Sequence, residues 1–186
     1  MKFGQTSFII MAVTYVAAFL LSITGNTLVF ESSYIYALNI ASSILLFLFF
    51  KDLLEKSNEK TKNAIILSVI SSLGIFICNL GLFFIKSGVL NNILLVVNAL
   101  SYALITFAFF LMIFKVKNIY SKLSFISFII TLIFAQLMLA MLLNTTLNLG
   151  VVIDLSYISV LCVFGVLSSL LLFNTYTKIH KNLSVN

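Results

Sequence analysis

Asp154 is the one acidic residue of this sequence that falls inside an apolar segment long enough to cross a lipid bilayer, residues 151–174. Placing a carboxylate in a membrane costs about 2.5–3.5 kcal/mol at the helix centre and less toward the surface, so such groups usually have a function. On a helical wheel, small and polar side chains share its side of the segment: Tyr157, Gly165, Ser168 and Ser169. Asp154 is therefore our first candidate contact for a cation, a proton or a basic group of a solute.

Carboxamide side chains recur at a similar depth in other apolar segments. Counted from the predicted outer end of each helix, at about 1.5 Å per residue, four of them lie about 9–10 Å deep: Asn39, Asn79, Asn98 and Gln136. Asn and Gln often hold membrane helices together through interhelical hydrogen bonds. The alternative is that these four side chains, with Tyr157 and Asp154, form a ligand-binding pocket that opens to the outside. Both interpretations stay open at this point.

The same residues argue against enzymatic chemistry. His180 is the single His of the chain and lies outside the apolar segments, so haem ligation, a His-bound metal and a Ser–His pair within the membrane are excluded. Cys78 and Cys162 form no CxxC motif and are expected to be buried apolar residues. Nucleotide-binding loop motifs are absent. We expect a protein that is not an enzyme and that uses no cofactor and no metal ion.

The composition places these residues in a membrane. The chain has 186 residues, of which 62% are hydrophobic and 9% are charged, and its mean hydropathy is +1.20. A soluble protein needs a more highly charged surface. The net charge of +6 would suggest nucleic-acid binding in a soluble protein, but here the lysine distribution fits membrane topology and no nucleic-acid partner is expected. Residues 1–186 are predicted to form a single integral membrane domain in contact with the lipid bilayer.

Lysine positions predict the topology. Ten of the 11 lysines fall on one side of the predicted membrane segments, and Lys86 lies alone on the other. The sequence therefore predicts an all-α membrane protein, a six-helix bundle of the cell membrane with both termini in the cytoplasm. The first segment is expected to be a retained helix rather than a cleaved signal peptide. The predicted spans are residues 8–24, 33–50, 63–85, 93–114, 123–143 and 151–174.

Two further patterns bear on organisation and partners. The motif Asn39-x-x-Ser42 recurs as Asn98-x-x-Ser101, one helical hairpin further along, which suggests three tandem hairpins; chance explains two short matches equally well. The polar loops 51–62 and 115–122 either set the topology or dock a cytoplasmic protein. Two functions follow as hypotheses: transport or solute and ion binding, and a non-catalytic membrane subunit, sensor or assembly partner of a larger complex.

Overall fold

Six α-helices make up the computed structural model, which describes residues 2–24, 33–85, 87–115, 122–147 and 155–183. The all-α prediction is confirmed over these residues. In chain order the helices are α1 (Lys2–Ile23), α2 (Ser33–Glu55), α3 (Glu59–Phe84), α4 (Val89–Lys115), α5 (Lys122–Leu147) and α6 (Leu155–Leu183).

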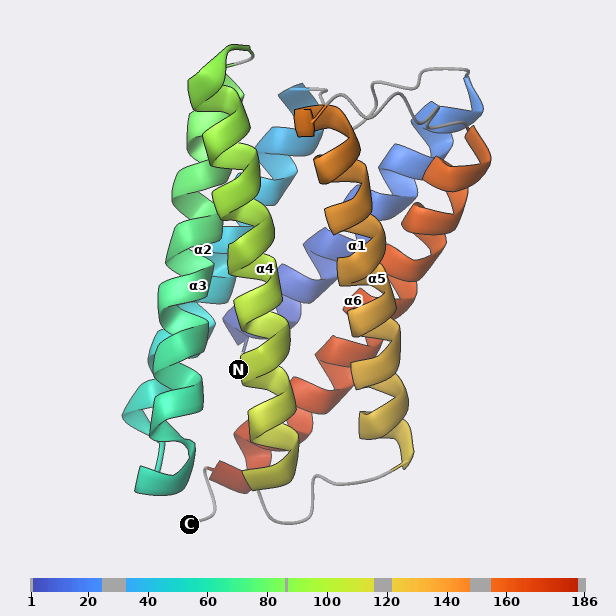
Figure 1. Ribbon diagram of the computed structural model, residues 1–186. Helices are drawn as coiled ribbons and strands as arrows, with labels where there is room; N and C mark the ends of the chain where they lie inside the picture. Colours follow the sequence, from blue (N-terminus) through green and yellow to red (C-terminus); the bar gives the residue numbers. More distant parts are fainter. Residues whose placement is uncertain (1, 25–32, 86, 116–121, 148–154, 184–186) are drawn as a thin grey trace.

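The helices form a closed ring (Figure 1). Each packs against its neighbours in the chain, and α6 packs against α1 to complete the circle. The start of α1 therefore lies beside the end of α6, where Phe8 stacks on Tyr176 with ring centres 5.4 Å apart. The three predicted hairpins exist as packed pairs, but α2–α3 and α4–α5 pack as well, so the hairpins are not separate units within the ring.

Many large apolar side chains of the bundle are exposed on its outside, and many of its small polar side chains are buried. On α3, for example, Ile70 and Ile77 are exposed, whereas Ser68, Ser72 and Asn79 are buried. Exposed apolar faces of this extent are rare on soluble proteins. Five helices, namely α1, α2, α3, α4 and α6, are long and apolar enough to cross a bilayer. In α5 the described apolar stretch, Phe125–Met141, is shorter. The fold is thus an apolar helical bundle compatible with a membrane protein.

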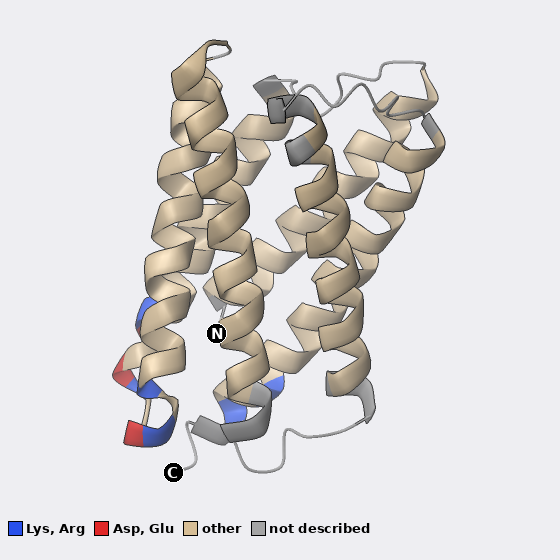
Figure 2. Ribbon diagram, in the orientation of Figure 1, with Lys and Arg blue, Asp and Glu red and all other residues tan. Residues whose placement is uncertain are grey.

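The charged side chains that the structure describes gather at one end of the ring (Figure 2). They lie where α2 turns into α3 and where α6 ends: Lys51, Asp52, Glu55, Lys56, Glu59, Lys60, Lys62, Lys178 and Lys181. This placement agrees with the lysine asymmetry of the sequence. Lys86 and Asp154, which the sequence places at the other end, lie outside the described residues.

Several helices are longer than the predicted spans, and the predicted boundaries that are wrong include the end of the second span, the start of the third and the end of the sixth. Most of the predicted loop 51–62 is helical, because α2 continues to Glu55 and α3 begins at Glu59. Asn58 caps α3 by accepting a hydrogen bond of 3.2 Å from the backbone N–H of Thr61. The sixth helix continues to Leu183. Hydropathy detects only the apolar part of a helix, so polar turns that extend it beyond the membrane are missed. Of loop 115–122, only its two ends are described.

A cluster of aromatic side chains fills the interior of the helix bundle near its charged end. The ring of Tyr176 on α6 lies 5.4 Å from Phe8 of α1, 5.7 Å from Phe49 and 5.4 Å from Phe50 of α2, and 5.3 Å from Phe109 of α4. All five rings are buried, and such pairs add about 0.5–1.5 kcal/mol each beyond area burial. The cluster closes this half of the ring interior.

Candidate ligand-binding cavity

A cavity of about 80 Å³ lies inside the ring, in the half away from the charged end. Its walls come from the early turns of α2 and α4, the last turns of α3, and parts of α1 and α5. Three carboxamides line it, one each from α2, α3 and α4: Asn39, Asn79 and Asn98. Asn79 is 2% exposed, and the other two are half-buried. The structure therefore brings together three of the four carboxamides that the sequence places at one depth.

The amides of α3 and α4 form an incomplete pair. Asn98 Nδ2 donates to Asn79 Oδ1 over a long distance of 3.4 Å. Asn79 Nδ2 and Asn98 Oδ1, both buried, have no hydrogen-bond partner among the described residues. The Tyr102 phenol approaches the Asn79 side chain, but not in a geometry that satisfies the amide nitrogen. An unpaired buried polar group costs about 1–3 kcal/mol, so proteins rarely keep one without a reason. Within the described residues, the pair thus leaves Asn79 Nδ2 as a donor and Asn98 Oδ1 as an acceptor without a hydrogen bond.

Tyr15 of α1 is held in the wall by close packing against α6. A Cβ atom at Gly165 would lie 2.6 Å from the Tyr15 ring, so only glycine lets the ring approach the α6 backbone this closely. The other side of the ring meets Phe134 of α5 edge-on, with centres 5.0 Å apart. On the small and polar face predicted for the sixth helix, Gly165 thus provides the space in which the Tyr15 ring packs against α6.

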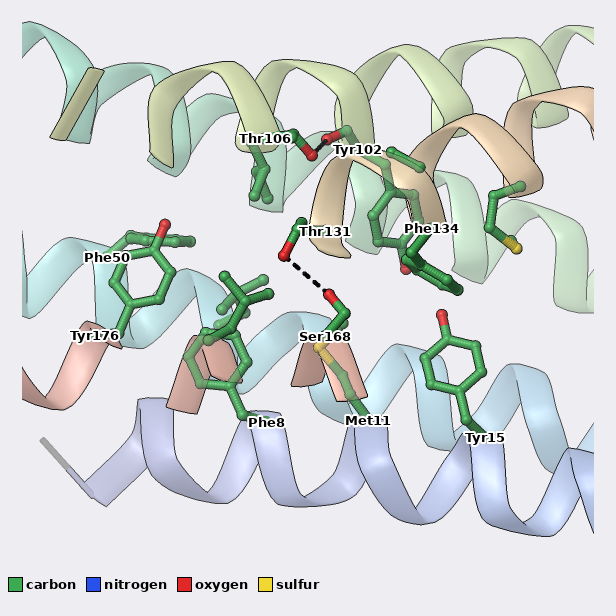
Figure 3. Close-up of a pocket in the computed structure, with 15 residues that line it drawn as sticks. Phe8, Met11, Tyr15, Phe50, Tyr102, Thr106, Thr131, Phe134, Ser168 and Tyr176 are labelled. Carbon is green, nitrogen blue, oxygen red and sulfur yellow. Dashed lines mark hydrogen bonds between the residues drawn. The ribbon is translucent and has the colours of Figure 1, made fainter. Parts of the chain in front are cut away.

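A second, largely apolar cavity of about 50 Å³ continues toward the aromatic cluster (Figure 3). It shares the side chains of Tyr15, Tyr102, Ala135 and Met138 with the polar cavity. On its wall, the hydroxyls of Thr131 and Ser168 lie 3.1 Å apart and link α5 to α6. The ring interior thus holds a polar cavity beside an apolar one.

The remaining candidate residues lie elsewhere. Gln136 is exposed on α5, beside a groove between α4 and α5. The hydroxyl of Tyr157 donates to the backbone carbonyl of Leu137 and so connects α6 to α5; Tyr157 is not among the described residues that line the polar cavity. Asp154 lies outside the described residues, so its place relative to the amides stays a prediction.

Sequence reasoning missed the contact of His180 with Asp52 and Lys56. His180 of α6 is 8% exposed, and its Nε2 lies 3.1 Å from Asp52 Oδ2 and 3.1 Å from Lys56 Nζ, both on α2. Lys56 also forms a salt bridge of 3.0 Å with Asp52. One tautomer of the imidazole donates to the carboxylate and the other accepts from the ammonium. The cluster fastens the end of α6 to α2 at the charged end. No local pattern signals it, since Asp52 and His180 are far apart in sequence.

The site chemistry is that of neutral hydrogen bonding. The described residues lining the polar cavity carry amides and hydroxyls but no charged group, and the described part of the chain holds no group of three or more His, Cys, Asp or Glu that could bind a metal. Comparisons with known protein families, with curated proteins and with solved structures find no match to this chain. Its function must therefore be argued from the cavity itself.

Proposed function

We propose that this chain is a multi-pass protein of the cell membrane that binds an uncharged polar solute in the cavity between α2, α3 and α4 and takes part in its transport. The observation that carries the proposal is the incomplete amide pair at an internal cavity, in which Asn79 Nδ2 and Asn98 Oδ1 have no hydrogen-bond partner among the described residues. If these amides only held helices together, both polar ends of each would be expected to find a partner.

The orientation follows from charge. By the positive-inside rule, the lysine-rich end of the bundle faces the cytoplasm. The polar cavity then lies in the outer half of the membrane and is reached from outside, while the aromatic cluster around Tyr176 closes the inner half. In this arrangement α5 also crosses the membrane, in addition to the other five helices. The chain then crosses six times, and both termini are cytoplasmic.

The free groups also define the ligand chemistry. A ligand that presents an acceptor to Asn79 Nδ2 and a donor to Asn98 Oδ1 completes both amides at once. A carboxamide or a lactam has this donor and acceptor side by side.

Asp154 would add a charged contact for a cation or a proton. Replacement of Asp154 by Asn removes the charge and keeps the shape. If the role is real, the variant should insert normally and lose ligand-dependent stabilisation.

A second function is favoured by a different surface. The turn between α2 and α3 presents exposed charges, among them Glu55, Lys56 and Lys60, which fits a non-catalytic subunit or sensor that docks a cytoplasmic protein. Purification with partners retained separates the two cases. A stoichiometric ATPase would point to transport, and a kinase to sensing.

That the protein is not an enzyme and needs no cofactor stays a prediction of the sequence.

The direct test is ligand-dependent stabilisation by short, water-soluble primary amides, from acetamide to hexanamide. We expect at least one of them to raise the thermal midpoint of the detergent-solubilised protein, and Asn98→Leu to abolish the rise. Asn92→Leu is the matched control, because Asn92 is exposed on α4 and does not line the cavity. Equal stabilisation of the wild type and Asn98→Leu, or no stabilisation by any amide, would contradict the proposal.

A further inference from the structure

A groove of about 360 Å³ runs along the outside of the ring between α4 and α5. Its lining is almost wholly apolar and includes Ala99, Ala103 and Phe107 from α4 and Phe128, Ala135 and Leu139 from α5. The surrounding exterior of both helices is apolar as well. In a membrane, this groove opens toward the hydrocarbon.

Only a thin wall separates the groove from the ring interior. Ala99, Ala135 and Leu139 line both the groove and the polar cavity, and Thr106 and Ala135 line both the groove and the apolar cavity. Ala135 thus borders all three spaces. Two of the side chains in the wall are single methyl groups, so a small separation of α4 and α5 would join the groove to the amides.

The sizes of the three spaces indicate how they would be used. The internal cavities, at about 80 and 50 Å³, are well below the 300–1,000 Å³ typical of sites for organic ligands. The groove reaches that range. A ligand larger than a few atoms can therefore place its polar end at the amides only if the rest of it lies in the groove.

A polar side chain marks the groove. Gln136 is exposed there on an otherwise apolar helix face. An amide that faces lipid lacks hydrogen-bond partners, which is costly in hydrocarbon. A passing ligand with a hydrogen-bonding head group would satisfy Gln136 on its way to Asn79 and Asn98.

We propose that the groove is a lateral opening through which a single-chain amphiphile with an uncharged hydrogen-bonding head group enters the cavity from the bilayer. The head group pairs with Asn79 and Asn98, and the chain stays in the groove against Phe107 and Phe128. The inference rests on the proposed function, whose solute it specifies. Because lipid tails are as apolar as the groove, the chain gains little by moving into it, so recognition depends on the head group.

The test uses the full-length protein in phosphatidylcholine vesicles and a photoreactive 16-carbon primary amide with a diazirine in its chain. Its matched probe is the methyl ester of the same chain, which has no donor. Ala103→Phe narrows the groove without touching the cavities, since Ala103 is exposed and lines only the groove. Ala41→Phe is the control, at an exposed position on α2 that lines none of the three spaces.

We expect the amide to label α4 and α5 peptides at the groove at least tenfold more than the ester does. Ala103→Phe should reduce this labelling at least tenfold and Ala41→Phe should leave it unchanged, while Asn79→Leu/Asn98→Leu should reduce it to the ester level. Labelling that is insensitive to Ala103→Phe would overturn the lateral opening. Equal labelling by both probes would overturn it too, because the groove would then hold any lipid chain.

Failure of this inference and failure of the proposed function give different results. If hexanamide stabilises the wild type and Ala103→Phe alike, but the long-chain amide does not label the groove, the cavity binds a solute and only the lateral route is lost. If neither the stabilisation by hexanamide nor the labelling by the long-chain amide depends on Asn79 and Asn98, the proposed function and the lateral route are both lost.

Discussion

Replacing the amide pair between α3 and α4 by leucines should not weaken the protein. In Asn79→Leu/Asn98→Leu, the one hydrogen bond lost is long, at 3.4 Å, and interhelical hydrogen bonds in membranes are worth about 0.6 kcal/mol on average. The same change removes two buried amide atoms that have no partner among the described residues. Each unpaired atom costs about 1–3 kcal/mol, with the lower end applying where water enters the cavity. We expect the double variant to be more stable than the wild type by about 1–2 kcal/mol.

The single variants test whether the two amides are paired. Asn79→Leu leaves the Asn98 amide without its remaining partner, so we expect it to be less stable than the double variant by about 1 kcal/mol. The measurement is a double-mutant cycle of unfolding free energies in detergent micelles, with helix content and elution volume confirming that each variant folds. A double variant that is destabilised by more than about 1 kcal/mol, with single effects that are not additive, would refute the reasoning and show that the amides hold α3 and α4 together.

Three further predictions concern other parts of the ring. Gly165→Ala places a methyl group against the Tyr15 ring, so thermal unfolding should show a loss of about 1–3 kcal/mol; an unchanged midpoint would mean that Tyr15 moves freely. Asp52→Ala leaves the buried His180 without its carboxylate and should cost about 1–2 kcal/mol, whereas Glu55→Ala, an exposed change one turn away, should cost less than about 0.5 kcal/mol; equal losses would argue against the cluster. Reporter fusions after Lys62, Lys122 and the C-terminus should read cytoplasmic and those after Glu31, Gly88 and Asn148 external; a cytoplasmic result at Asn148 would break the six-span topology.

The amide cluster was predictable because depth and helical face are local properties. Counting residues from the helix ends placed Asn39, Asn79 and Asn98 at one level, and the polar stripe of α3, with Ser68, Ser72 and Asn79 on one face, pointed inward. Depth alone failed for Gln136. Its helix, α5, is apolar on nearly every face. The sequence therefore shows no difference between a polar and an apolar face that would indicate which side of α5 points into the bundle.

Other features depend on contacts between distant parts of the chain. The pairing of Asp52 with His180 follows from the closure of the ring by α1 and α6, and no local pattern shows that closure. The predicted tail after residue 174 likewise proved to be a packed helix, in which Tyr176 and Ile179 are buried. Hydropathy ends a span where polar residues begin, although the helix and its packing continue.

Solute-dependent protection of a cysteine in the cavity tests the central claim most directly. Cys78 and Cys162 are buried, so a new thiol at Asn39→Cys, in the cavity wall, can be followed by its reaction rate with methyl methanethiosulfonate. We predict that hexanamide slows this reaction at least tenfold, and that the slowing disappears when Asn79→Leu and Asn98→Leu are added. A reaction rate that does not depend on hexanamide in the otherwise wild-type protein would contradict the account.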